Sequence, residues 1–108
     1  MRCALLIILV AGCSRDVAGG KADGAQVFAD ACAVCHGPAG APTEAMVAQL
    51  KVRDLTSAEF KGRANRELVI TQVTRGSANK VMPSFAGALT DAQIAAVADY
   101  VLTLGPAK

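Results

Sequence analysis

The sequence is poor in the side chains that usually fill a protein core. Only 4% of its 108 residues are aromatic, tryptophan is absent, and much of the 53% hydrophobic content is alanine. Small domains with so few large apolar residues usually need a disulfide, a metal or a cofactor to supplement their packing. The composition therefore favours a bound group without saying which one.

Charge is sparse and excludes a nucleic-acid partner. The formal net charge is +2, and no long charged run or basic strip interleaved with aromatic residues occurs. Residues 51–80 nevertheless hold seven basic side chains against three acidic ones. This segment predicts either a basic surface that steers docking onto an acidic protein or an ordinary solvated helix surface. The basic residues are Lys51, Arg53, Lys61, Arg63, Arg66, Arg75 and Lys80.

The N-terminal apolar run is too short to span a membrane, which takes about 20 residues. Cys3–Gly12 has ten residues and follows Arg2, which suits the hydrophobic region of a signal peptide. The run leads into Val10-Ala11-Gly12-Cys13, which resembles the bacterial lipobox, where a cysteine is lipidated and becomes the mature N-terminus. Plain secretion, with cleavage near Val17-Ala18-Gly19, and a retained anchor are the alternatives.

These features divide the chain into three parts. Residues 1–12 are predicted to be a signal peptide of the lipoprotein type. Residues 13–22 are predicted to be the lipidated Cys13 and a flexible tether, because they contain two glycines and alternating charges without apolar periodicity. Residues 23–108 are predicted to form one domain.

Capping residues mark the helices, and no segment shows the alternation of a strand. Asp23 begins a variant of the capping box, and Thr56 begins a full one that Gly62 soon interrupts. Asn65 can cap a helix that Gly76 ends. The fold is therefore predicted to be all-α.

The last helix has the clearest pattern. Thr90 opens a capping box with Gln93, and Leu89 and Ile94 flank it as a hydrophobic staple. The helix is predicted to end at Gly105-Pro106. Its predicted buried stripe comprises Ile94, Val97, Val101 and Leu104.

Two long stretches, Gly37–Leu55 and Gly76–Leu89, are predicted to be irregular. Irregular segments of this length are uncommon in a compact domain unless they serve a function. We expect both of them to wrap a bound group.

The strongest chemical signal is Cys32-Ala33-Val34-Cys35-His36. Cys-x-x-Cys-His is the haem c attachment signature, because two thiols three residues apart face the same side of a helix end and can add to two porphyrin vinyl groups. Zinc would need a second Cys/His pair, which the sequence lacks, and a dithiol oxidoreductase would need a preceding strand. A disulfide framework is not expected, since Cys3 would leave with the signal peptide and Cys13 would be lipidated.

The chain has one histidine, so a second axial ligand must be a methionine, a lysine or nothing. Met46 follows His36 by only ten residues, whereas Met82 precedes a proline in the second irregular stretch, with enough chain to reach the opposite face. We predict that His36 and Met82 ligate the iron. Met46 and Lys80 are the alternatives.

Several further pieces of the sequence agree with one family. They are Gly24-x-x-x-Phe28, the Cys32–His36 motif, Val81-Met82-Pro83-x-Phe85, Leu89-Thr90 and Tyr100-Val101. With them the chain resembles a class I cytochrome c from about Gly24 to Leu104. The resemblance implies a cytochrome c fold of about four to five short helices around one covalent haem c. Cys32 and Cys35 would form the thioethers, and His36 and Met82 would be the axial ligands.

The resemblance also implies particular contacts. The first helix would cross the last one near Tyr100, where Gly24 permits a close approach. A carbonyl of Pro38 or Pro42 would accept the second ring N–H of the proximal histidine. The stretch Leu50–Thr56 is similar to bacterial members found beside dehydrogenases and oxidases.

These predictions describe an electron carrier rather than an enzyme, because filled axial positions leave no place for a small-molecule substrate. We expect it on the periplasmic side of a bacterial membrane, anchored through Cys13 and exchanging electrons with a dehydrogenase or an oxidase. One alternative is a haem subunit held in such a complex. Another is an enzyme or gas sensor in which Met82 does not bind and the distal position is open.

Overall fold

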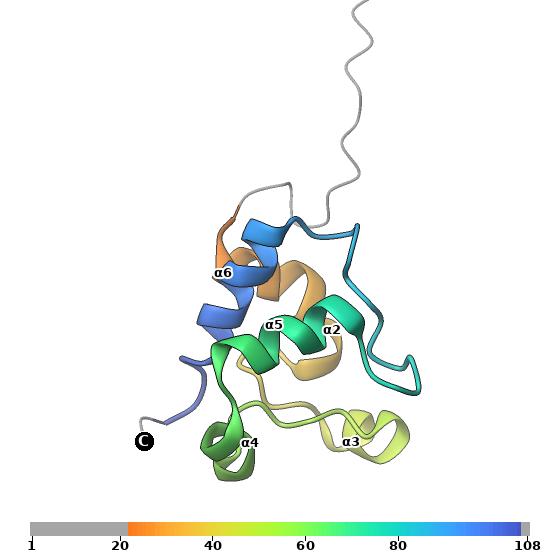
Figure 1. The fold of residues 1–108 in the computed structure, drawn as a ribbon. Helices are drawn as coiled ribbons and strands as arrows, with labels where there is room; N and C mark the ends of the chain where they lie inside the picture. Colours follow the sequence, from red (N-terminus) through yellow and green to blue (C-terminus); the bar gives the residue numbers. More distant parts are fainter. Residues whose placement is uncertain (1–21, 107–108) are drawn as a thin grey trace, which may run out of the picture.

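The computed structural model describes residues 22–106, which fold into helices joined by loops (Figure 1). The helices are α1 (Gly24–Val27), the π-helical turn η2 (Phe28–Cys32), α2 (Ala33–His36), α3 (Glu44–Leu50), α4 (Ala58–Arg63), α5 (Arg66–Arg75) and α6 (Asp91–Val101). No strand occurs within this range, where the only β-type pairing is an isolated bridge between Ala86 and Leu89. The all-α prediction is confirmed. The predicted signal peptide, Cys13 and nearly all of the tether lie outside the described residues.

The elements α1, η2 and α2 follow one another without a break and end at the Cys32–His36 motif. Asp23 caps them as predicted, because its carboxylate accepts a backbone N–H of the first turn at 3.2 Å. The middle is π-helical, with the Ala33 N–H bonded to the Phe28 carbonyl. Gly37 ends the helix with a φ of +80°. The motif therefore lies at a helix end, as the sequence predicts.

Helix α6 packs closely across α1, as the resemblance implied. A Cβ atom on Gly24 would lie 2.3 Å from the Ala96 carbonyl oxygen, so this position has no room for a side chain. The rings of Phe28 and Tyr100 meet next to this crossing, with centroids 5.5 Å apart.

Helix α6 begins at its predicted cap and ends earlier than predicted. The Thr90 hydroxyl accepts the Gln93 N–H at 3.1 Å, and the Gln93 side chain accepts the Thr90 N–H at 2.9 Å. The helix ends at Val101, and the chain continues in a turn in which the Leu104 N–H donates to the Val101 carbonyl at 3.2 Å. Leu104 is nevertheless buried. All four residues of the predicted stripe are therefore buried, although Leu104 lies after the end of the helix.

The caps of α4 and α5 confirm one prediction and correct another. Thr56 was predicted to cap α4, but the cap is Ser57, whose hydroxyl accepts the Phe60 N–H at 3.1 Å. The Thr56 hydroxyl instead donates to the Asp54 carboxylate at 2.6 Å. Asn65 caps α5 as predicted.

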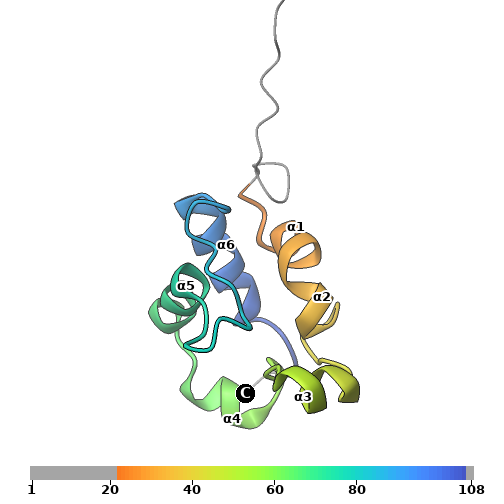
Figure 2. The ribbon, with the colours of Figure 1, turned by 90° about the vertical axis from the view of Figure 1, so that its right-hand side faces the viewer.

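The prediction that Gly37–Leu55 is irregular is wrong in part, because α3 occupies its centre. Thr43 caps α3 by accepting the Met46 N–H at 3.2 Å, and Lys51 ends it in the left-handed conformation with a φ of +56°. No residue of α3 is fully buried, and its seven residues are too few to establish a helical period from the sequence. The second stretch, Gly76–Leu89, has no helix, as predicted. Figures 1 and 2 show α3 and α4 together at one end of the molecule.

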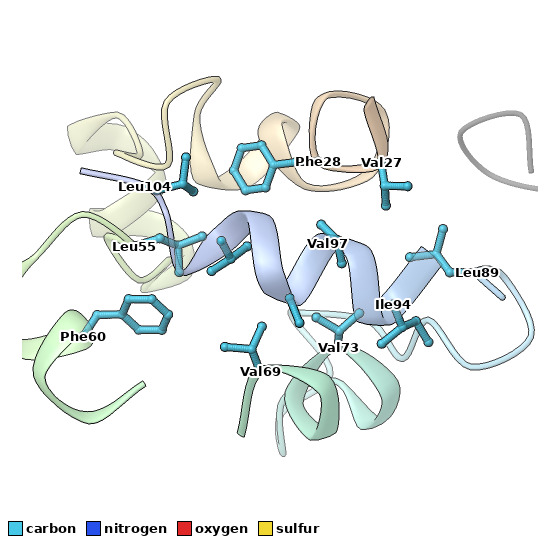
Figure 3. Close-up of a cluster of buried hydrophobic side chains, with 12 residues drawn as sticks. Val27, Phe28, Leu55, Phe60, Val69, Val73, Leu89, Ile94, Val97 and Leu104 are labelled. Carbon is cyan, nitrogen blue, oxygen red and sulfur yellow. The ribbon is translucent and has the colours of Figure 1, made fainter. Parts of the chain in front are cut away.

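The buried core is small and lies around α6 (Figure 3). Val27 and Phe28 pack on one side of α6, and Val69 and Val73 of α5 pack on the other. Several core side chains, Phe28 and Val97 among them, also face a cavity. The core is therefore continuous with the candidate site.

Candidate functional site

A cavity of about 610 Å³ lies between the first helix, the segment Leu50–Leu55, α5, the loop after α5, and α6. Its volume falls within the range of small-molecule and cofactor sites, about 300–1,000 Å³, and its walls are mainly apolar. The four predicted site residues, Cys32, Cys35, His36 and Met82, all line it. The structure thus brings together the motif at the end of the first helix and the methionine of the distant loop.

His36 is oriented by a backbone carbonyl. Its Nδ1 atom lies 3.0 Å from the carbonyl oxygen of Arg53. A carbonyl only accepts, so Nδ1 carries the proton and Nε2 keeps its lone pair for a metal. The implied role of Pro38 or Pro42 is wrong, because Arg53 supplies this acceptor.

The Arg53 carbonyl lies beside His36 because two loop segments pair with each other. The Leu55 N–H donates to the Gly40 carbonyl at 2.9 Å, which brings the backbone around Arg53 beside the turn that follows His36. The carboxylate of Asp54 then fixes this segment by accepting the Thr56 N–H at 2.8 Å. This pairing joins residues that no local sequence pattern links.

Burial keeps both His36 and Cys32 in their neutral forms. Burial lowers the pKa of His36, and the hydrogen bond to the Arg53 carbonyl partly opposes this shift. Burial, with the charge of Cys35 as the smaller cause, raises the pKa of the Cys32 thiol to about 11. A neutral imidazole is the form that binds a metal, whereas such a thiol lacks the low pKa of a dithiol oxidoreductase. Within the described residues Cys32 and Cys35 are both free of disulfides.

Met82 reaches the cavity from the loop that joins α5 to α6, and its side chain is half-buried. The alternative ligands do not line the cavity. Met46 lies on α3, and the Lys80 side chain donates instead to the Arg75 carbonyl at 3.3 Å. Met82 is therefore the candidate on the distal side.

Several polar residues of the cavity wall were not predicted from the sequence. Lys51, Arg53 and Arg63 line it, and in the described part of the chain no carboxylate does. The only feature of the sequence that marked these three residues was the excess of basic over acidic side chains in residues 51–80. That excess by itself predicted a basic surface. Ser77 and Asn79 also line the wall, close to Met82 in sequence.

The site fits a metal that is held inside a macrocycle rather than a bare ion. Residues 22–106 contain no group of three His, Cys, Asp or Glu side chains that could hold a metal ion. A haem iron needs only axial ligands from the protein, and one imidazole and one thioether line this apolar cavity beside two thiols. Fold and site together define a small all-helical haem-binding protein.

Comparison with known proteins agrees with this class. The family model described as cytochrome c matches residues 21–105. Cytochrome c6 of Thermosynechococcus vestitus is 38% identical over 101 residues, which cover 93% of this chain and 85% of that protein. Cytochrome c6 of Microcystis aeruginosa is 40% identical over 80 residues, covering 74% and 91%. The solved structure of the KustC0563 c-type cytochrome has a TM-score of 0.69 at 27% identity, covering 78% of this chain and 99% of that one.

The chain belongs to the cytochrome c family. It carries one covalently attached haem c, and electron transfer through this haem is its class of function. None of the helices in residues 22–106 is both long and apolar enough to cross a membrane.

Proposed function

We propose that this cytochrome is a single-electron carrier and not an enzyme, with haem c attached through Cys32 and Cys35 and ligated by His36 and Met82. The observation that carries the proposal is that these four side chains, from two distant parts of the chain, line one cavity. When bound, the haem supplies an iron that alternates between Fe(II) and Fe(III).

The chain's own groups favour the transfer of single electrons to and from this iron. His36 offers Nε2 with its tautomer held by the Arg53 carbonyl, an arrangement that fixes the ring and strengthens its donation to a metal. Met82 offers a soft thioether, which favours Fe(II) and raises the potential. With His36 and Met82 both bound to it, a haem iron would change its coordination little between the two oxidation states and would have no position left for a substrate.

Basic residues serve the haem and the redox partner. Lys51, Arg53 and Arg63 provide positive charge on a cavity wall without carboxylates, which suits the two propionates of a haem. Among the remaining basic side chains of residues 51–80, Arg66 is paired with Asp99 at 2.8 Å, and the others favour docking onto an acidic surface of a dehydrogenase or an oxidase.

The proposed location is the periplasmic side of a bacterial membrane, with a lipid on Cys13 as the anchor. The support is the apolar run Cys3–Gly12 and the small residues before Cys13. Residues 13–22 then serve as the tether between the lipid and the haem domain.

Met82→Ala tests the ligation. The variant should keep its covalent haem, bind carbon monoxide readily when reduced, and lose more than about 100 mV of potential, a modest part of the roughly 0.8 V that axial ligands span. Potentiometric titration and carbon monoxide difference spectra measure both effects.

Met46→Ala is the matched control, because Met46 lies on α3 and does not line the cavity. It should behave as the wild type does. If Met82→Ala leaves potential and spectrum unchanged, the distal ligand is another residue. If the unmodified reduced protein already binds carbon monoxide rapidly, the distal position is open and the carrier proposal is wrong.

A further inference from the structure

In the loop after α5, Ser77 forms hydrogen bonds to the backbone of Met82 on both sides of its Cα atom. The Met82 N–H donates to the Ser77 hydroxyl at 3.1 Å, and the Ser77 N–H donates to the Met82 carbonyl at 2.9 Å. Both backbone polar groups of Met82 are thus bonded to a single residue. Ser77 also lines the cavity that Met82 faces.

Asn79 determines how the Ser77 hydroxyl is used. The hydroxyl lies 2.6 Å from the Asn79 Oδ1 atom, which also accepts the Val81 N–H at 3.1 Å. The hydroxyl has one proton, and it is donated to Asn79, so the oxygen presents a lone pair to the Met82 N–H. The Ser77 hydroxyl, the Val81 N–H and the Met82 N–H thus each have an acceptor.

The turn itself is tight. The Lys80 N–H donates to the Ser77 carbonyl at 3.0 Å, and Lys80 has a φ of +62°. Gly76, with a φ of +74°, lies so close that a Cβ atom there would be 2.5 Å from the Met82 carbonyl oxygen. Since residues 76–89 contain no helix, hydrogen bonds of this kind are what give the loop one conformation.

We propose that Ser77 is a positioning residue that keeps the Met82 side chain on the cavity, and that Asn79 orients the Ser77 hydroxyl for this task. The inference rests on the proposed role of Met82 as the distal ligand. A ligand on a loop binds with an apparent affinity reduced by the fraction of loop conformations that present it. Ser77 raises that fraction, and without its hydroxyl the Met82 N–H loses its acceptor.

The test is the rate at which carbon monoxide binds to the reduced holoprotein, measured by stopped flow, because the gas can enter only after Met82 has left. Ser77→Ala removes the hydrogen bonds of the hydroxyl to the Met82 N–H and to Asn79, and it should raise the rate about tenfold. Ser77→Thr keeps the hydroxyl and should stay close to the wild type. Asn79→Ala should raise the rate by a smaller factor and gives a second test if Ser77→Ala does not fold.

Asn65→Ala is the matched control, because it removes an asparagine whose side chain accepts the Leu68 N–H at 2.8 Å and caps the opposite end of α5 from the Met82 loop. It should lower the melting temperature without changing the rate. If Asn65→Ala accelerates binding as much as Ser77→Ala, the effect is general destabilisation and the proposal fails. If Ser77→Ala matches the wild type while Met82→Ala binds quickly, Met82 is the ligand but Ser77 does not position it. If Met82→Ala has no effect on binding, the proposed ligation itself is wrong.

Discussion

At the scale of single residues, the direction in which the side chains of the Cys32–His36 motif face depends on where the helix ends. Gly37 takes a φ of +80°, and a Cβ atom there would lie 2.3 Å from the Ala41 carbonyl oxygen. The chain therefore reverses directly after His36 and returns along the cavity, where the Arg53 carbonyl meets the imidazole. Because the motif lies at the last turn of the helix, the two thiols and the imidazole face one cavity.

The thiols are predicted to be the covalent link. Cys32→Ala or Cys35→Ala alone should weaken formation of the holoprotein, because one thioether remains in each. The double variant should contain no covalent haem, since the described chain has no other thiol on the cavity. Haem staining on denaturing gels and the mass of the intact protein measure this, with Met82→Ala as a control that keeps its haem. Haem that stays with the denatured double variant would contradict the attachment.

At the scale of elements, the crossing of α1 and α6 orients the first helix and with it the motif. Gly24 permits the contact, and the rings of Phe28 and Tyr100 extend it. The π-helical turn η2 then rotates the last turn of the helix relative to a regular α-helix, because each bond spans one additional residue. Packing at one end and the π turn in the middle together set the direction in which the motif faces.

Gly24→Ala should disturb this crossing. The new methyl group would meet the backbone of α6, which cannot move aside easily, and overpacking of this kind costs about 1–3 kcal/mol. In a domain of this size the melting temperature falls by roughly 4–8 °C for each kcal/mol. Thermal unfolding of the holoprotein, followed by circular dichroism, measures the loss.

Gly62→Ala is the matched control for this substitution. Gly62 lies inside α4 and an added Cβ atom would meet nothing within 4 Å, so alanine should be neutral or stabilising by up to about 1 kcal/mol. Equal melting temperatures for the two variants would show that the crossing has room for a side chain.

At the scale of the whole molecule, the haem cavity interrupts the core. Core side chains on the first helix, α4, α5 and α6 form part of its wall, and so does the loop that carries Met82. The residues that line the cavity and belong to the core are Phe28, Leu55, Phe60, Val69, Val73, Val97 and Val101. A bound haem would thus complete a core that the protein alone leaves open.

Without haem the domain should therefore be largely unfolded. The double variant Cys32→Ala/Cys35→Ala, made without haem, should show little helix and no cooperative thermal transition, because helices of 4–11 residues are marginal when isolated in water. Circular dichroism compares it with the holoprotein. A cooperative transition with the helix content of the holoprotein would mean that the protein core suffices alone.

The membrane anchor is predicted to depend on Cys13. A diacyl or triacyl chain contributes about 0.8 kcal/mol for each buried methylene, so one residue decides membrane residence. Cys13→Ala should release the protein from membranes or stall its processing, with an unchanged haem spectrum. Cys3→Ala, in the segment that is predicted to be removed, is the matched control and should behave as the wild type does. A Cys13→Ala protein that stays in the membrane fraction after a high-salt wash would exclude the lipid anchor.

Local patterns in the sequence were sufficient for the fold class, three of the four predicted helix caps and the four cavity-lining residues that were predicted as haem-binding. Capping boxes and a ligand motif work over a few neighbouring residues, so they can be read without knowing the fold. The predictions at Asp23, Asn65 and Thr90 are confirmed for this reason. Helix α3 was missed because its seven residues are too few to establish a helical period from the sequence.

Only the tertiary structure decided which distant groups meet. The pairing of Leu55 with Gly40 placed the Arg53 carbonyl, rather than that of Pro38 or Pro42, beside His36. Contacts across the loops likewise brought Lys51, Arg53 and Arg63 to the cavity wall. The sequence determined which chemical groups the protein has and their local geometry. Their partners were decided by packing and backbone hydrogen bonds between remote segments, because those energies depend on the whole chain at once.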